Sequence, residues 1–267
     1  MKCYKKAFGL YGIEVKYDFR RKIKKFNSLI QDSKKIVFFG GAGVSTESGI
    51  PDFRSKDGLY NTMGIKFEKY SPEYLLSSDC LHKEPEVFFE FYRQKLDCRE
   101  IEPNIAHKVL AEMEKKEKLS SIITQNIDGL HQKAGSKKVR EIHGTTLKNY
   151  CIRCGQLFPA DYIFKNEEIV PHCHENECGG IIRPNVVLYG ESLPSSAWDE
   201  AYNDLAEADL IIVGGTSLTV YPAAHLIEEY VRFKKVVLIN RDITPIDNEC
   251  EIVFRESISK VFSKIEF

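Results

Sequence analysis

Residues 40–54 read GGAGVSTESGIPDFR, and they directly follow the apolar run IVFF at residues 36–39. A short run of β-branched and aromatic residues is typical of a buried strand. A strand, a tight glycine turn and a helix form the layout that points backbone N–H groups and a helix N-terminus at a phosphate, and we expect that layout here. After Gly43 the next glycine is Gly49, so the spacing differs from the usual dinucleotide fingerprint. The stretch therefore predicts a phosphate-binding loop of unusual spacing, followed directly by an acid, an aromatic residue and a permanent cation.

Strands and helices alternate along most of the remaining chain. Apolar runs predict further buried strands at residues 121–124, 208–213, 235–240 and 252–254. Helical patterns lie in residues 1–30, 70–100 and 103–116, after Pro222, and at about 256–265. This alternation indicates an α/β fold with a doubly wound parallel sheet covered on both faces. Residues 146–185 break the pattern and predict a small inserted module.

Four of the eight cysteines are clustered in that module. They are Cys151, Cys154, Cys173 and Cys178. Two thiolate pairs at these spacings can close a tetrahedral zinc site, and four protein ligands would leave no open position for chemistry. The zinc would therefore be structural. A site that uses His172 or His174 as one ligand, an iron–sulfur cluster and unpaired thiols are the alternatives.

Charge and hydropathy limit the classes of partner. The net charge is −1, from 38 basic and 39 acidic residues, so no overall field attracts nucleic acid or an anionic membrane. No apolar run approaches the ~20 residues that span a bilayer, and no secretory pattern opens the chain, so we expect a cytoplasmic protein. We also expect a monomer. A basic cluster within residues 20–25 is read as the solvated face of the first helix, whose apolar face carries Phe19, Ile23, Phe26 and Ile30.

Three later segments extend the pattern of residues 40–54. They are TQNIDGLH at residues 124–131, HGT at 143–145, and GGTSL at 214–218 with YPAA at 221–224. In this order the four segments resemble the signature of the sirtuins, the NAD-dependent protein lysine deacylases. The resemblance runs from about Ile36 to the C-terminus. It implies NAD as co-substrate, an acylated lysine in an extended peptide as substrate, and transfer of the acyl group to ADP-ribose with release of nicotinamide.

The resemblance also implies a division into domains. Residues 1–54, 101–145 and 186–267 would form a large, Rossmann-like NAD-binding domain. Residues 55–100 would be the helical part of a small domain, and residues 146–185 would be its zinc-binding ribbon.

His143 is the candidate general base, because the ordinary pKa of histidine lies close to the pH at which such a base works. A histidine that ends an apolar stretch is often structural, but the resemblance makes this one catalytic, with Asn126 beside the reacting ribose. It also implies that Gln125 approaches the ribose and that Asp128 and the Ile127 backbone meet the nicotinamide carboxamide. Asp128 alone is equally explained as the cap of a following helix.

Further cofactor-binding residues follow from the same resemblance. They are Ala42, Gly43 and Thr46 in the glycine loop, Phe53 and Arg54 after it, and Thr216, Ser217, Asn240 and Ile258 around the adenosine. Ser45 is read either as a member of this loop or as a helix N-cap.

The substrate-binding residues are less sharply defined. Residues 185–191 resemble a loop that pairs with an extended peptide by β-augmentation, so Val187 would border the acyl-lysine tunnel, with Gly190 and Glu191 beside it. Tyr92 and Lys95 occupy positions where sirtuins that prefer succinyl or malonyl groups carry tyrosine and arginine. Lysine lacks the bidentate geometry of arginine, so we expect acetyl-lysine rather than an acidic acyl group, and Tyr92 is also read as a core residue.

Other functions use the same motifs differently. Mono-ADP-ribosyl transfer to protein would use the same NAD site with another acceptor, and a nucleotide-sensing binding protein would bind without turnover. An ordinary dehydrogenase fits least, because the glycine spacing is wrong and no second substrate domain is present.

Overall fold

The computed structural model describes residues 4–52, 58–61 and 64–267, and for residues 4–17 and 65 it describes only the backbone. A six-stranded sheet forms its larger part, in the order β3-β2-β1-β7-β8-β9. The strands are β1 (Ile36–Gly40), β2 (Leu119–Thr124), β3 (Val139–Glu141), β7 (Leu210–Gly214), β8 (Lys235–Ile239) and β9 (Ile252–Phe254). All neighbouring strands pair in parallel. The chain moves outward from β1 to β3 on one side and from β7 to β9 on the other, so the strand order reverses between β1 and β7.

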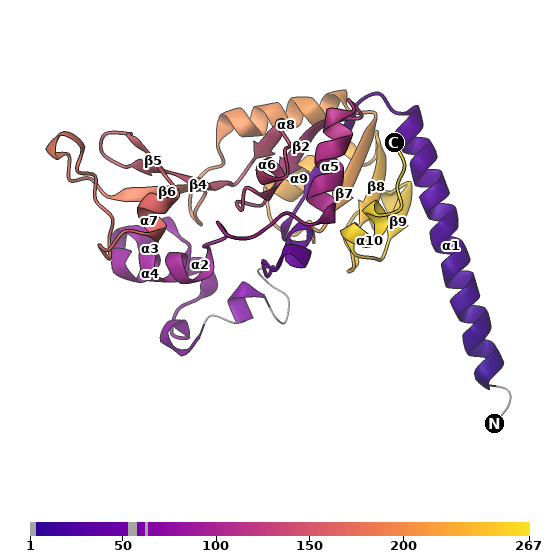
Figure 1. Cartoon of the computed structure of the whole chain (residues 1–267), viewed down its shortest axis with the longest axis horizontal. Helices are drawn as coiled ribbons and strands as arrows, with labels where there is room; N and C mark the ends of the chain where they lie inside the picture. The colour runs from indigo at the N-terminus through magenta and orange to yellow at the C-terminus, as the bar shows by residue number, and fades with distance from the viewer. Residues whose placement is uncertain (1–3, 53–57, 62–63) are drawn as a thin grey trace.

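Helices cover both faces of this sheet (Figure 1). Side chains of β1 alternate between the two faces: Ile36 and Phe38 join one apolar cluster, and Val37 and Phe39 join the other. The first cluster includes residues of α1 (Tyr4–Asp32), α5 (Ile105–Lys115) and α10 (Ile258–Phe262). The second includes residues of α8 (Ser195–Glu207) and α9 (Ala223–Tyr230). The predicted doubly wound parallel sheet is therefore confirmed.

A smaller unit lies at the other end of the molecule (Figure 1). It contains an antiparallel sheet of three strands, β4 (Gly144–Cys151), β5 (Leu157–Pro159) and β6 (Ile182–Val186), in the order β5-β4-β6. Four helices accompany it, namely α2 (Pro72–Leu75), α3 (Ser78–Lys83), α4 (Pro85–Lys95) and α7 (Asp161–Phe164). Aromatic residues of α4, such as Phe88 and Phe89, pack with Ile163 and Ile182 in one buried cluster. The helices of residues 72–95 and the three-stranded sheet thus share a core.

The first helix docks as its sequence predicts. Phe26 and Ile30 of α1 are fully buried, and Phe19 and Ile23 pack against the same cluster. The Phe19 ring meets the ring of Phe254 in β9 edge to face, with centroids 5.9 Å apart. The N-terminal end of α1 extends beyond the sheet (Figure 1).

The prediction of a helix directly after the glycine stretch is wrong. Two short 3₁₀ turns, Ala42–Val44 and Thr46–Ser48, stand in its place. Gly49 ends the second turn in the left-handed region at φ 94°, and the residue before Pro51 is disfavoured from helical backbone angles. The chain therefore leaves the sheet as a loop.

Three other helices differ from the prediction. The helix expected from Pro103 begins at Ile105, because the Asn104 side chain accepts a hydrogen bond from the Ala106 N–H and caps it. The final helix is shorter, at Ile258–Phe262, and is capped by Ser257. The sequence pattern missed α8, whose fully buried residues, Ala201 and Leu205, form too thin an apolar stripe.

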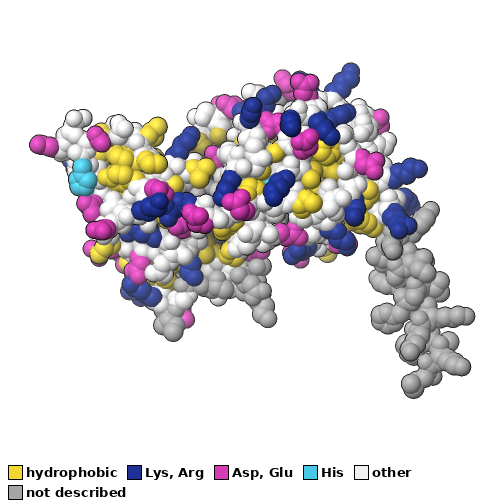
Figure 2. Space-filling model, viewed as in Figure 1, with side chains coloured by type: hydrophobic (Ala, Val, Ile, Leu, Met, Phe, Trp, Pro, Cys, Tyr) yellow, Lys and Arg dark blue, Asp and Glu magenta, His cyan; other side chains and the backbone are white. Residues whose placement is uncertain are grey.

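Charged side chains of both signs are interspersed over the face drawn in Figure 2. This distribution agrees with the nearly neutral net charge. Within the described parts of the chain, no helix combines the length and the apolar character needed to cross a membrane.

Candidate active site

A cavity of about 1020 Å³ lies where the strand order reverses. Its walls include Gly41–Gly43 after β1, Gln125–Ile127 after β2, Gly215–Ser217 after β7, Asn240 after β8, and Val186–Glu191 at the end of β6. Open parallel sheets bind ligands at the carboxyl ends of their strands, at such a reversal. The cavity is therefore the primary candidate for a binding site.

The loops that follow β1 and β7 meet backbone to backbone in this cavity. The Gly41 N–H donates to the Gly214 carbonyl at 3.2 Å, and the Gly43 N–H donates to the Gly215 carbonyl at 2.8 Å. A Cβ atom on Gly43 would lie 2.8 Å from the Gly215 Cα and 2.9 Å from its carbonyl oxygen. Glycine is therefore required at position 43, and the close approach leaves a wall without side chains that a phosphate can contact.

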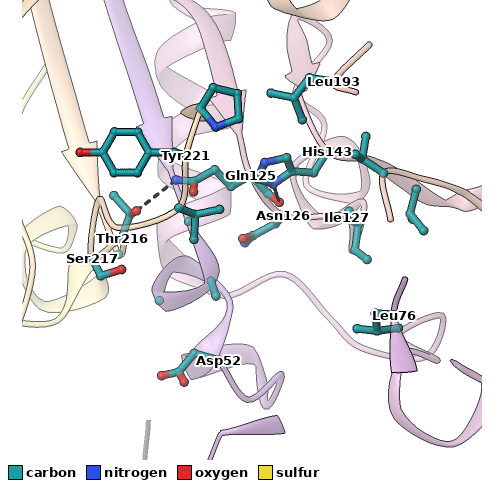
Figure 3. Close-up of a pocket in the computed structure, with 18 of the residues that line it drawn as sticks. Asp52, Leu76, Gln125, Asn126, Ile127, His143, Leu193, Thr216, Ser217 and Tyr221 are labelled. Carbon is teal, nitrogen blue, oxygen red and sulfur yellow. Dashed lines mark hydrogen bonds between the residues drawn. The ribbon is translucent and has the colours of Figure 1, made fainter. Parts of the chain in front are cut away.

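The segment after β2 brings polar groups to the centre of the site (Figure 3). The Gln125 side chain donates from Nε2 to Thr216 Oγ1 at 3.0 Å, which joins the loops after β2 and β7. Asn126 is 9% exposed, and its Nδ2 donates to Ser45 Oγ at 3.1 Å. The three neighbouring segments thus hold one another in a fixed arrangement.

His143 directly precedes β4 and lines the same cavity. Its Nδ1 lies 3.0 Å from the Gln125 carbonyl oxygen, which can only accept a hydrogen bond, so Nδ1 carries the proton. In the neutral ring Nε2 is then the nitrogen that can accept a proton. Burial lowers the pKa of His143 and outweighs the opposing effect of the bond to Gln125. The ring is therefore neutral at pH 7 and suited to act as a base.

A second cavity, of about 310 Å³, shares Ala42, Leu96, Asn126 and Ile127 with the first. Asp128 lines it, and its carboxylate accepts the Ser45 hydroxyl at 2.6 Å and the Leu130 N–H at 2.9 Å. Burial raises the pKa of Asp128 against the lowering effect of these bonds. Asp128 thus accepts a hydrogen bond from the first residue of α6 (Leu130–Lys133) and also lines the smaller cavity.

The Ser45 hydroxyl belongs to this polar group and makes no capping hydrogen bond. Ser45 stands at the N-cap position of the second 3₁₀ turn, but its side chain bonds to Asp128 instead of capping that turn. His107 Nε2 lies 3.4 Å from Ser45 Oγ, and the His107 and His131 ring centroids are 4.8 Å apart. Burial lowers the pKa of His107 to about 4, and it also lowers the pKa of His131. Sequence reasoning missed this histidine pair, although His131 ends the segment TQNIDGLH.

Most other predicted residues reach the cavities. Ala42, Gly43, Thr46, Thr216, Ser217, Asn240, Ile258, Val187, Gly190 and Glu191 line the larger one. Lys95 lines the smaller one. Phe53 and Arg54 lie outside the described residues.

Tyr92 is placed differently from the substrate role expected for it. Its side chain is fully buried, and its ring stacks on those of Phe88 and Phe164 at centroid distances of 5.9 and 5.3 Å. It lines neither of the two cavities. The substrate assignment is corrected accordingly, and the alternative reading of Tyr92 as a core residue agrees with this packing.

The four clustered cysteines form a separate centre in the smaller unit. Sγ of Cys151 lies 3.6 Å from that of Cys178, and Sγ of Cys154 lies 3.8 Å from that of Cys173. All four sulfur atoms lie within 4.8 Å of one another. Bonded sulfurs would be about 2.05 Å apart, whereas thiolates in a tetrahedron around zinc at about 2.3 Å would be separated by about 3.8 Å. The spacing of the four thiols therefore fits a zinc site rather than disulfide bonds.

The two neighbouring histidines, His172 and His174, contact the Glu168 carboxylate and not the cysteine sulfurs. His172 Nδ1 lies 3.4 Å from one oxygen of Glu168, and His174 Nε2 lies 3.1 Å from the other. The geometry accordingly favours four cysteine ligands over a set with one histidine.

An open parallel sheet with a cavity at its point of strand reversal is typical of nucleotide-binding proteins. Comparison with known proteins shows to which family of this class the chain belongs. A model of the Sir2 family matches residues 41–222, and the chain belongs to this family. The NAD-dependent protein deacetylase of Clostridium acetobutylicum is 50% identical over 244 residues, which cover 91% of this chain and 98% of that protein. That of Cutibacterium acnes is 47% identical over 237 residues, covering 89% of this chain and 94% of the relative.

Solved structures agree with the family assignment. One, described as Sir2-p53 peptide-NAD+, has a TM-score of 0.80 and 39% identity and covers 91% of this chain and 96% of its own. Another, described as Sir2 bound to acetylated peptide, has a TM-score of 0.81 and 37% identity with the same coverage of both chains. The predicted family and fold class are therefore confirmed.

Proposed function

We propose that this protein is an NAD-dependent protein lysine deacetylase, which transfers the acetyl group of acetyl-lysine to ADP-ribose and releases nicotinamide. The observation that carries the proposal is the meeting of the glycine loop, Gln125–Asn126 and a neutral His143 in one cavity. Relatives that share about half of their residues with this chain are named NAD-dependent protein deacetylases.

NAD supplies an electrophilic ribose carbon and nicotinamide as the leaving group. In our proposal the backbone of Gly41–Gly43 and Gly215 receives the pyrophosphate, since glycines leave no Cβ that would block the close approach of an anion. Asn240 and Ile258, which line the same cavity, would lie at the adenosine end. Asp128 and the Ile127 backbone hold the carboxamide in the smaller cavity, where Asn126 forms the shared wall.

His143 would then act on the ribose. Its Nε2 accepts the proton of a ribose hydroxyl, and the Gln125 carbonyl keeps the ring in the required tautomer. Asn126 would orient the reacting groups beside it. The peptide would lie along Val187–Gly190, with its acyl-lysine entering the larger cavity.

The remaining assignments complete the proposal. The four cysteines would hold one structural zinc ion, which the sulfur spacing supports. Residues 55–100 and 146–185 would together form the small domain.

The test incubates the purified protein with NAD and an acetyl-lysine peptide while free nicotinamide and peptide mass are followed. We expect one nicotinamide released for each acetyl group lost. NAD cleavage with added mass on the peptide would indicate ADP-ribosyl transfer instead. Faster turnover of a succinyl-lysine peptide than of the acetyl-lysine peptide would overturn the acetyl preference. If no NAD were consumed, the remaining hypothesis would be a nucleotide-sensing binding protein without turnover.

Replacing Gly43 with alanine should raise the KM for NAD by at least about tenfold. The new Cβ would press on the Gly215 backbone, so the two phosphate-side loops must separate. Initial rates with NAD varied at saturating peptide check this, with Gly64→Ala as the control. Gly64, unlike Gly43, has a positive φ, of 89°, which strains any substitution, but a Cβ there meets nothing within 4 Å and the residue lines neither cavity. An unchanged KM in a folded Gly43→Ala protein would contradict the role of this contact.

A further inference from the structure

A mostly buried ion pair links Arg183 in β6 to Glu191, at the end of the segment that follows this strand. The side chain of Arg183, within β6, is 7% exposed, and that of Glu191 is 24% exposed. Both terminal nitrogens of Arg183 donate to the Glu191 carboxylate, and the bond from Nη2 to Oε2 measures 3.0 Å. Two parallel bonds of this kind fix orientation as well as distance. We call this pair the Arg183–Glu191 clamp.

The clamp also holds the backbone between its two ends. Arg183 Nη2 donates to the Val186 carbonyl at 2.8 Å, and its Nε donates to the Pro184 carbonyl at 3.2 Å. Glu191 Oε2 accepts the Leu188 N–H at 2.9 Å. Two side chains therefore fix backbone groups at three points of one short segment.

The clamped segment joins the two sides of the larger cavity. The Val187 N–H donates to the backbone carbonyl of His143 at 2.9 Å. On the other side, the Tyr189 N–H donates to the Leu76 carbonyl and the Ser78 N–H donates to the Tyr189 carbonyl, both at 3.0 Å. Val186–Glu191 all line the cavity. The segment thus connects the candidate base with the helical part of the smaller unit.

The opposite charges of Arg183 and Glu191 stabilise each other in this mostly buried position. Burial would raise the pKa of Glu191, but the bonds from Arg183 and from the Leu188 N–H together lower it. The Arg183 guanidinium also lies 5.5 Å from the centre of the Tyr150 ring. Loss of the Glu191 charge would leave a buried guanidinium without its counter-ion, which is costly, so the surrounding backbone would have to move.

We propose that Arg183 and Glu191 are positioning residues that hold Val187–Tyr189 in the shape that receives an acylated peptide. The inference rests on the proposed function, since it concerns the peptide side of that site. The N–H groups of Val187, Leu188 and Tyr189 are all bonded within the protein, so a docking peptide would meet a backbone whose shape is already fixed. Ordering that backbone before binding reduces the entropy lost when the peptide docks.

The test variant is Glu191→Gln, which keeps the size of the side chain and removes its charge. We expect the Kd for a fluorescently labelled acetyl-lysine peptide, measured by anisotropy, to rise by about tenfold. The Kd for NAD should change by less than about twofold, because the clamp does not bond to the loops after β1 and β7. The amide hydrogens of Val187 and Leu188 should exchange faster in the variant. Glu191→Asp, which retains the charge, should recover part of the peptide affinity.

Asp204→Asn is the control, because the Asp204 side chain, 23% exposed, is about as buried as that of Glu191 and lines neither cavity. Its carboxylate lies 2.9 Å from Nε of Arg140, which also pairs with Glu200. This substitution should lower the Tm without changing peptide affinity. Equal peptide Kd values for Glu191→Gln and wild type, or equal losses in both variants, would overturn the inference. So would a wild-type protein that does not bind the peptide. A wild type that binds peptide but consumes no NAD would refute the proposed activity, while the comparison of Kd values would still decide the role of the clamp.

Discussion

Replacing His143 with alanine is expected to lower kcat for deacetylation by about 10²- to 10⁴-fold, the contribution typical of a general base. The Kd for NAD should stay within about threefold, because the loops after β1 and β7 hold the phosphate end without this ring. Single-turnover kinetics and isothermal titration separate the two effects. His225→Ala is the control, since His225 lies on α9 with its side chain 65% exposed and lines neither cavity.

The same residue should set the acid limb of the pH profile. Burial disfavours the charged ring, so the pKa of His143 lies below its ordinary value of 6.5. The base is then neutral and active above that pKa, and kcat/KM should fall only as the pH drops through a value below 6.5. A midpoint above 6.5, or a His143→Ala enzyme with wild-type kcat, would contradict the assignment of this base.

Removing the metal from the four-cysteine centre should unfold the smaller unit. Structural zinc contributes an apparent ~10–16 kcal/mol in small zinc modules, which is comparable with the whole stability of a typical domain. We expect one zinc ion per chain, and a protein treated with chelator, or Cys173→Ser, should lose peptide-dependent activity and melt at a lower temperature. Metal analysis and thermal unfolding by circular dichroism measure these effects.

Cys250→Ser is the control for the cysteine substitution. Cys250 lies between the 3₁₀ turn Asp247–Glu249 and β9, outside the cluster, where its thiol contacts the Ile246 carbonyl at 3.2 Å. It should retain full zinc content and activity. A folded, active wild-type protein without stoichiometric metal would rule out the structural role.

The sequence predicted the parts of the fold that depend on short, strong patterns. Runs such as residues 36–39 and 236–239 are wholly apolar because both faces of the sheet are covered, so the strands could be recognised without any structure. The four cysteines likewise carry their chemistry in their spacing. The loop after β1 was harder, because glycines permit several turns, and Gly49 and Pro51 prevented the expected helix.

Contacts between distant segments could not be predicted from local patterns. Ser45 and Asp128 are joined by a hydrogen bond although they lie on different loops, and His107 approaches them from a third element. Tyr92 shows the opposite case, in which a position suggested by resemblance is occupied by core packing. In both cases the outcome depends on which surfaces the helices bury, and no single segment encodes that.

One strand connects the two centres of the molecule. β4 begins directly after His143 and ends at Cys151, so the candidate base and a candidate metal ligand lie at the two ends of the same element. Its pairing with β6 shifts register between Thr145 and Asn149 and is regular from Asn149 to Cys151, and Cys154 follows in the connection to β5. Exchange of this module between relatives in a chimaeric enzyme must therefore preserve the paired end of β4 and the spacing from Cys151 to Cys154, because a one-residue insertion there would turn a metal ligand away from the other three.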